Sequence, residues 1–139
     1  MFWLQKSVSY SSFLTELLII FCNDHTILFH MSIEIQHHIH IYFSDATEST
    51  AKDVYKKLQQ HPNVLSVGRF HPKPVGPHPV RQFQIMVKPD ILEDFLLWLD
   101  TIRNGLDVFI HPLIDDDLLA HTKLVRWLGN PHTLNLDRL

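Results

Sequence analysis

Cysteine and charged residues are scarce in this chain of 139 residues. The single cysteine, Cys22, allows no internal disulfide and excludes the cysteine-rich zinc modules. This cysteine usage fits a reducing compartment, so we expect a cytoplasmic protein. Charged residues make up 19% of the chain, and the net charge is -3 with neutral histidines, so no broad basic surface points to nucleic acid.

Long apolar runs are missing as well. The stretch from Phe13 to Phe21 is interrupted by Glu16 and is too short to span a bilayer. The segment also lacks the basic start and the small-residue cleavage site of a signal peptide. We therefore expect no membrane partner.

The first thirty residues read differently from the rest of the chain. We interpret residues 1–30 as an N-terminal extension outside the domain, either disordered, loosely helical, or the result of an incorrectly assigned start, with Met31 as the true first residue. Residues 31–139 have the size of one ordinary domain.

Histidine is the abundant residue, with eleven copies. Histidine is the commonest metal ligand in proteins, so the excess is the first functional clue. Apolar residues make up 45% of the chain, which is enough for a hydrophobic core. A high count of histidines can also arise by chance, so the positions of the histidines must show whether they form a metal site.

Alternation of apolar and polar residues predicts strands over residues 35–43, 64–70, 81–88 and 106–112. Apolar stripes at helical spacing predict helices between residues 47 and 61 and between residues 89 and 105. The order β-α-β-β-α-β predicts an α+β protein of the ferredoxin-like class, with a four-stranded antiparallel sheet and two helices on one face. We expect the C-terminal extension from Ile114 onward to fold over the other face.

That second face collects histidines, amides and aromatic residues. Its predicted members are His38, His40, Tyr42, Gln82, Gln84, Phe109 and His111. His121 follows in a helical stretch, and His78 lies on a loop stiffened by four prolines between residues 72 and 79. Imidazoles from separate elements form a site that suits iron, zinc, copper or nickel, and three such ligands leave positions open for substrate.

Any one histidine on a β-strand is more often a hydrogen-bonded or solvated side chain than a metal ligand. We interpret His37, His61, His71 and His132 in that way, as surface residues. The run of three aspartates from Asp115 is more typical of a solvated helix start than of a cation site.

Six short segments resemble, in order, the DOPA 4,5-dioxygenase family. They are His40–Phe43, Pro74–Pro79, Gln82–Gln84, Phe109–Pro112, Asp116–Thr122 and Trp127–Gly129. The resemblance covers roughly residues 34–139. It implies a ferredoxin-like fold and extradiol cleavage of L-DOPA or a related catechol by molecular oxygen.

The resemblance also implies a metal site. We expect Fe(II), with zinc as an alternative in the purified protein, to be held by His40, His111 and His121. His78 is then either a fourth ligand or the acid–base group, and Tyr42 and Gln82 position the substrate or a water molecule.

Two other functions fit the same residues. A non-catalytic ferredoxin-like module could use the histidine face to bind a metal or a small aromatic ligand, and exposed sheet edges would permit a homodimer. A zinc hydrolase is the third hypothesis, although only Asp116 or Asp117 could serve as its general base.

Overall fold

The computed structural model describes residues 15–22, 25–32 and 34–139, and for residues 15–32 it describes the backbone alone. The chain divides into two compact units, with the division after Glu34. Among the described residues, no helix combines the length and the apolar character needed to cross a membrane.

The N-terminal unit contains two antiparallel strands, β1 (Thr15–Cys22) and β2 (His25–Ser32). Their register pairs the first residue of β1 with the last of β2. Where the sequence suggested a loose helix or a disordered segment, the described residues therefore form strands, in keeping with their content of β-branched isoleucine. The rest of the predicted extension, residues 1–14, 23 and 24, lies outside the described residues.

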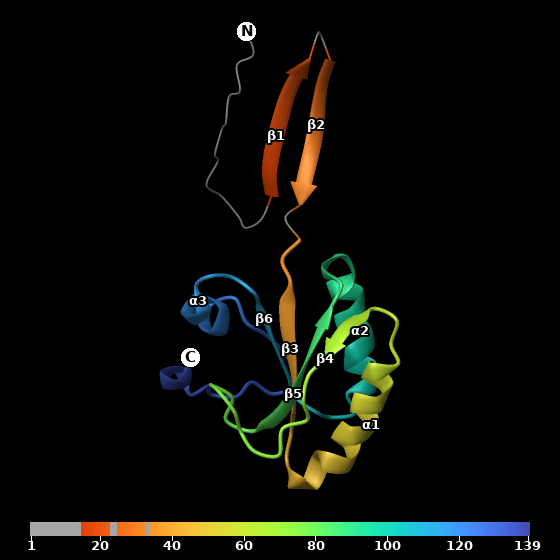
Figure 1. Cartoon of the computed structure of the whole chain (residues 1–139), viewed down its shortest axis with the longest axis vertical. Coiled ribbons are helices and arrows are strands. Elements are labelled where there is room, and N and C mark those ends of the chain that lie inside the picture. Colours follow the sequence, from red (N-terminus) through yellow and green to blue (C-terminus); the bar gives the residue numbers. More distant parts are fainter. Residues whose placement is uncertain (1–14, 23–24, 33) are drawn as a thin grey trace. The chain divides into compact units, whose positions relative to one another are not determined.

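The second unit is built on one antiparallel sheet. Its strands are β3 (His37–Phe43), β4 (Val64–Val67), β5 (Arg81–Val87), β6 (Val108–Pro112) and β7 (Arg126–Leu128). The strand order is β4-β5-β3-β6-β7, so β3 lies at the centre between β5 and β6 (Figure 1).

The sheet has five strands, which confirms the predicted α+β class but corrects the predicted four-stranded ferredoxin-like sheet. The additional strand comes from the C-terminal extension, where Leu128 pairs with Val108 and Trp127 with Phe109. With only three residues, β7 is too short for an alternating pattern to reveal it. The extension therefore widens the sheet as well as covering its second face.

Two helices cover one face of the sheet, α1 (Glu48–Gln59) and α2 (Leu92–Ile102) (Figure 1). Ile39, Ile41 and Phe43 of β3 share the hydrophobic core with these helices, because side chains alternate between the two faces of a strand. A short helix, α3 (Asp117–Thr122), lies on the opposite side of the sheet with the C-terminal end of the chain. Three 3₁₀ turns complete the unit: η1 (Asp45–Thr47), η2 (Pro89–Ile91) and η3 (Leu136–Arg138).

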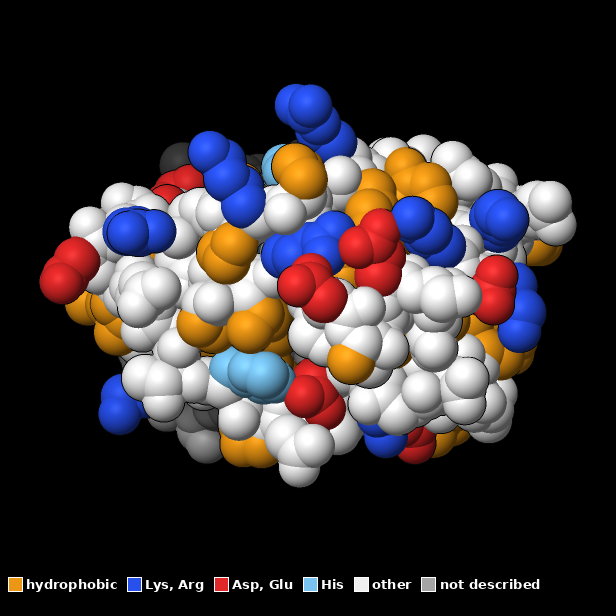
Figure 2. Space-filling model, turned by 90° about the horizontal axis from the view of Figure 1, so that it is seen from below, with side chains coloured by type: hydrophobic (Ala, Val, Ile, Leu, Met, Phe, Trp, Pro, Cys, Tyr) orange, Lys and Arg blue, Asp and Glu red, His pale blue; other side chains and the backbone are white. Residues whose placement is uncertain are grey.

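Charges of both signs are interspersed on the face of the molecule that Figure 2 shows. Among the described residues, ion pairs join Arg81 to Asp45 and Glu48, and Arg126 to Glu93. That face therefore presents no continuous basic surface of the kind that binds a nucleic-acid backbone.

Candidate metal centre and adjoining pocket

Three histidines converge on the sheet face away from α1 and α2. In the register of β3 and β6, His38 lies opposite His111, and His40 is two residues further along the same face. One ring nitrogen from each of the three lies within 4.8 Å of the others. The two closest, His40 Nε2 and His111 Nε2, are 3.2 Å apart.

The hydrogen bonds behind these rings fix which nitrogen carries the proton. The Nδ1–H of His111 donates to the carbonyl oxygen of Pro112 at 3.2 Å, and a carbonyl can only accept. The Nδ1–H of His40 donates to Gln82 Oε1, also at 3.2 Å. In their neutral forms both rings therefore present Nε2 lone pairs, and these lone pairs face each other.

Burial keeps these rings neutral. Desolvation lowers the pKa of His111 from 6.5 to about 3, helped by the nearby His121. Desolvation likewise places the pKa of His40 well below its ordinary value, and it lowers that of His38. Neutral imidazole is the form that binds metals, so the cluster is ready to bind a metal at neutral pH.

We expect the metal-free protein to lose stability as pH falls below about 6.5, because unfolded histidines then bind protons that folded His111 and His78 bind only near pH 3 to 4. Above pH 7 the histidines are neutral in both the folded and the unfolded state, so the free energy of unfolding is not reduced by their protonation. Carboxylates stay ionised between pH 7 and 5, so a lower urea midpoint at pH 5 would report the histidines. An unchanged midpoint over that range would contradict the assigned burial.

The donor set fits a metal ion. Two imidazole ligands at about 2.1 Å from one ion, separated by about 90–110°, lie about 3.0–3.4 Å from each other. The observed separation of His40 Nε2 and His111 Nε2 is 3.2 Å. Two lone pairs at that distance repel each other unless a cation lies between them, so the geometry favours a bound metal.

Two histidines, His121 and His38, are candidates for the third metal ligand. His121, which the sequence predicts, packs its ring on that of His111 with 4.0 Å between the centroids. Its Nδ1–H donates to the carbonyl oxygen of Asp117 at 2.8 Å, so the neutral form of the ring carries its lone pair on Nε2. His38 belongs to the group within 4.8 Å but was not selected from the sequence, although its spacing of two from His40 puts both on one face.

The proline-braced loop delivers His78 to the same face. His78 is buried, its ring lies 4.1 Å from that of His40, and its Nδ1 shares a 2.7 Å hydrogen bond with the hydroxyl of Tyr42. Desolvation lowers the pKa of His78 to about 4 and raises the pKa of Tyr42. The two side chains therefore form a neutral, buried pair next to the candidate metal ligands.

A cavity of about 230 Å³ opens beside the cluster. Its lining residues are Phe109, His121, Thr122, Val125, Trp127, His132, Thr133, Leu134 and Leu136. Phe109 connects it to the cluster, because its ring stacks on that of His111 with centroids 5.4 Å apart. Walls that are mostly apolar and aromatic suit a planar aromatic ligand.

His132 is not a simple surface residue. It is half-buried, and its Nε2 lies 2.7 Å from Asp107 Oδ2. The other oxygen of Asp107 accepts the backbone N–H of Asn130 at 2.7 Å. Desolvation acts to raise the pKa of Asp107, but the bonds from Asn130 and His132 outweigh it and lower that pKa.

Gly129 makes this arrangement possible. Its φ is +84°, and a Cβ there would overlap Asp107 Oδ1 and lie 2.9 Å from Arg103 Nη1. We expect Gly129→Ala to destabilise the protein by about 1–3 kcal/mol. Gly76→Ala is the matched control, since Gly76 has a φ of +55° but nothing within 4 Å of an added Cβ. Equal losses of thermal stability in the two variants would contradict the contact with Asp107.

Comparison with known proteins identifies the family. Residues 37–138 match the family described as the Dopa 4,5-dioxygenase family. The chain belongs to this family. The resemblance predicted from the six short segments is thereby confirmed, and the matched range includes every histidine of the cluster together with Asp107 and His132.

Individual relatives agree with the assignment. The chain is 32% identical over 110 residues to DOPA 4,5-dioxygenase of Amanita muscaria, a match that covers 73% of this chain and 48% of that protein. It is 28% identical over 111 residues to an uncharacterised 21.2 kDa protein of Botryotinia fuckeliana, covering 71% of this chain and 60% of that one. The chain thus spans about half the length of the curated relatives it matches.

A crystal structure from Nostoc punctiforme PCC 73102, of a candidate dioxygenase, shares the architecture. It superimposes with a TM-score of 0.71 at 35% identity, over 76% of this chain and 91% of that one. The fold of the second unit is therefore that of a dioxygenase-family domain.

Proposed function

We propose that this member of the Dopa 4,5-dioxygenase family is a metal-dependent extradiol dioxygenase. Its substrates are molecular oxygen and L-DOPA or a related catechol. One observation carries the proposal: the Nε2 atoms of His40 and His111 face each other at 3.2 Å, next to a cavity with aromatic walls. Membership of the Dopa 4,5-dioxygenase family supports a catechol as the substrate, and the neutral imidazoles of His40 and His111 offer ligands for the metal that such chemistry needs.

His40 and His111 would hold the metal, with His121 or His38 as the third ligand. The proposed ion is Fe(II), and zinc is the alternative in the purified protein. When bound, Fe(II) supplies the Lewis-acid and redox chemistry that lets molecular oxygen react with the catechol ring. Three protein ligands leave the remaining positions of the ion open.

Gln82 acts in this proposal as a positioning residue. It is buried on β5 opposite Tyr42, and its Oε1 accepts the Nδ1–H of His40. The bond orients the ring and keeps the lone pair on Nε2.

We expect Gln82→Leu to bind the metal about 10–100-fold more weakly, because the His40 ring would lose its orientation. Equilibrium dialysis with Fe(II) under nitrogen measures the change. Gln84→Leu, on the same strand but half-buried, is the control. Unchanged affinity in Gln82→Leu would remove the positioning role.

His78 and Tyr42 are the proposed proton relay. Their 2.7 Å hydrogen bond joins a phenol to a neutral imidazole, so a proton can pass between them without a net change in charge on the pair. His78 lies against His40 and does not line the cavity, whereas Tyr42 lines a neighbouring cavity of about 200 Å³, so His78 would act through Tyr42 and not by direct contact with the substrate.

The activity is tested by loading the full chain with Fe(II) without oxygen and then adding L-DOPA and air. Ring cleavage would give a semialdehyde that cyclises to a yellow product, with oxygen consumed in step. Caffeate and protocatechuate test other catechols. No oxygen uptake with any of the three, despite one bound iron per chain, would overturn the proposal in favour of a metal-binding module.

A further inference from the structure

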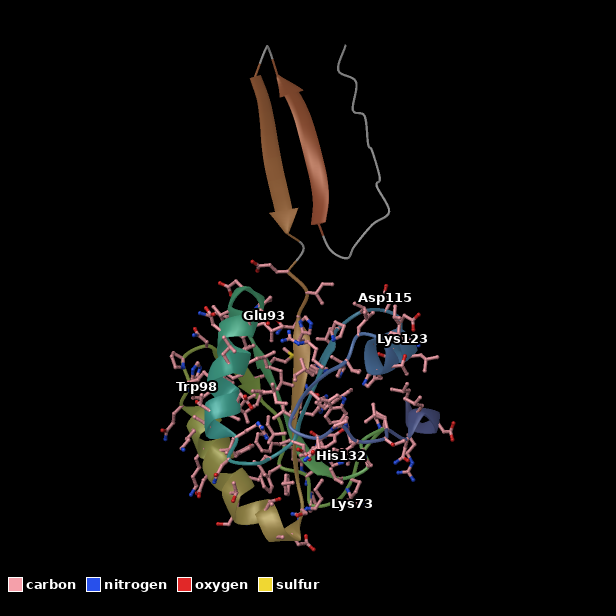
Figure 3. The ribbon with its side chains drawn as sticks, turned by 180° about the vertical axis from the view of Figure 1, so that it is seen from behind. Lys73, Glu93, Trp98, Asp115, Lys123 and His132 are labelled. Atoms are coloured by element: carbon pink, nitrogen blue, oxygen red, sulfur yellow. The ribbon has the colours of Figure 1, made fainter. Side chains whose placement is uncertain are left out.

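His132 and Asp107 form a hydrogen-bonded histidine–carboxylate pair at the edge of the cavity. Asp107 precedes β6 and His132 follows β7, so residues 25 apart in sequence are joined by the 2.7 Å contact. Figure 3 shows His132 on the side of the sheet where α3 lies, across from Trp98 of α2. Its ring packs on Trp127, with centroids 5.7 Å apart, and at right angles on Tyr42 at 5.2 Å.

The carboxylate decides the tautomer of His132. An ionised carboxylate only accepts hydrogen bonds, so the ring nitrogen facing Asp107, Nε2, must carry a proton. The neutral ring then presents a lone pair on Nδ1. This is the reverse of His40 and His111, whose Nδ1 atoms carry the proton and whose Nε2 atoms carry the lone pair.

The contact with Asp107 occupies Nε2 of His132 and leaves the other ring nitrogen, Nδ1, free. Across the described residues, Nδ1 has no hydrogen-bond partner, and the ring lines the 230 Å³ cavity together with His121. It also lines a second cavity of about 200 Å³, on the side of Tyr42 and Asp107. His78, by contrast, is buried and lines neither cavity. His132 is thus the imidazole with an orienting carboxylate that can touch a molecule in the pocket.

We propose that His132, oriented by Asp107, is a catalytic base that removes a proton from the catechol as the substrate binds. The inference rests on the proposed function and adds a residue to it. The O–H bond of one catechol hydroxyl breaks, its electron pair stays on the oxygen, and the proton forms the new N–H bond at His132 Nδ1. The resulting imidazolium is stabilised by the Asp107 carboxylate, as in other carboxylate–histidine pairs.

Proton counting tests this step without turnover. The full-length, metal-loaded protein is titrated with L-DOPA in the absence of oxygen, by calorimetry at pH 8 in buffers of different ionisation enthalpy. If His132 keeps the catechol proton, the wild type releases about one proton fewer per bound L-DOPA than His132→Gln. Asp107→Asn should also release more protons than the wild type, because the amide no longer fixes the tautomer. His71→Gln is the control, since the His71 side chain makes no hydrogen bond to any described residue.

Turnover gives the second measure. We expect kcat for L-DOPA to fall roughly 10²–10⁴-fold in His132→Gln, with metal content and circular dichroism unchanged. Equal proton release and turnover within about two-fold in the wild type and His132→Gln would overturn this inference and leave the proposed function standing. A wild type that neither binds nor cleaves L-DOPA would overturn both.

Discussion

Replacing His111 with alanine will remove both the bound metal and the ring-cleaving activity. His111 is nearly fully buried, and its Nε2 points at that of His40, so alanine deletes one of the two closest ligand atoms. Removing a residue behind a ligand costs about 10–100-fold in metal affinity, so losing the ligand itself should cost more than about 100-fold. Iron content after desalting and oxygen uptake with L-DOPA measure the two losses.

His71→Ala is the control for this variant and should keep both metal and activity. Parallel variants of the two remaining candidates decide the ligand set, because only the true third ligand should lose the metal when His38 or His121 becomes alanine. A His111→Ala protein that retains one iron per chain and full turnover would contradict the site.

Replacing His78 with alanine should separate metal binding from catalysis. The ring of His78 lies 4.1 Å from His40 but hydrogen-bonds to Tyr42, so its loss leaves the converging Nε2 atoms in place. We expect the variant to bind iron while its kcat falls roughly 10²–10⁴-fold, the usual contribution of a proton-transfer group.

Tyr42→Phe should behave in the same way as His78→Ala, since it removes the other half of the 2.7 Å bond. The two losses should not add, because either change breaks the same relay. If His78→Ala turns over at the wild-type rate, His78 has no part in proton transfer. If it loses the metal, His78 is a ligand and not a relay.

The sequence correctly predicts which side chains share one face of a strand, because that depends only on alternation within the strand. The period of two along β3 places His40 and Tyr42 on one face and the apolar residues between them on the other, where they join the core. The prolines around His78 likewise mark a stiff loop. Whether that loop reaches β3 is a tertiary contact that no local pattern contains.

Features that depend on pairing between distant segments could not be predicted. His38 joins the three-histidine group only through its register with His111 across two strands, and the sequence did not predict it as a ligand. Residues 106–112 were predicted as one strand, but β6 begins at Val108, so Asp107 lies outside it. His132 also lies outside the strands, so no periodicity links the two residues. Residues 64–70 were predicted as one strand, but β4 ends at Val67, after which the Gly68 N–H still donates to the carbonyl oxygen of Gln84 at 2.7 Å.

Several predictions concern the protein as a whole. A homodimer formed through the sheet edges, at β4 or β7, stays a prediction, as does a cytoplasmic location. The part played by residues 1–30 also stays a prediction, and comparing turnover of the full chain with that of residues 31–139 tests it.

The central claim is that the facing Nε2 atoms of His40 and His111 hold the metal. An anomalous diffraction map collected at the iron edge, from crystals grown with Fe(II) under nitrogen, tests it most directly. The account predicts one peak per chain, within about 2.1–2.3 Å of both Nε2 atoms. A peak elsewhere, or none in crystals whose protein carries stoichiometric iron, would contradict it.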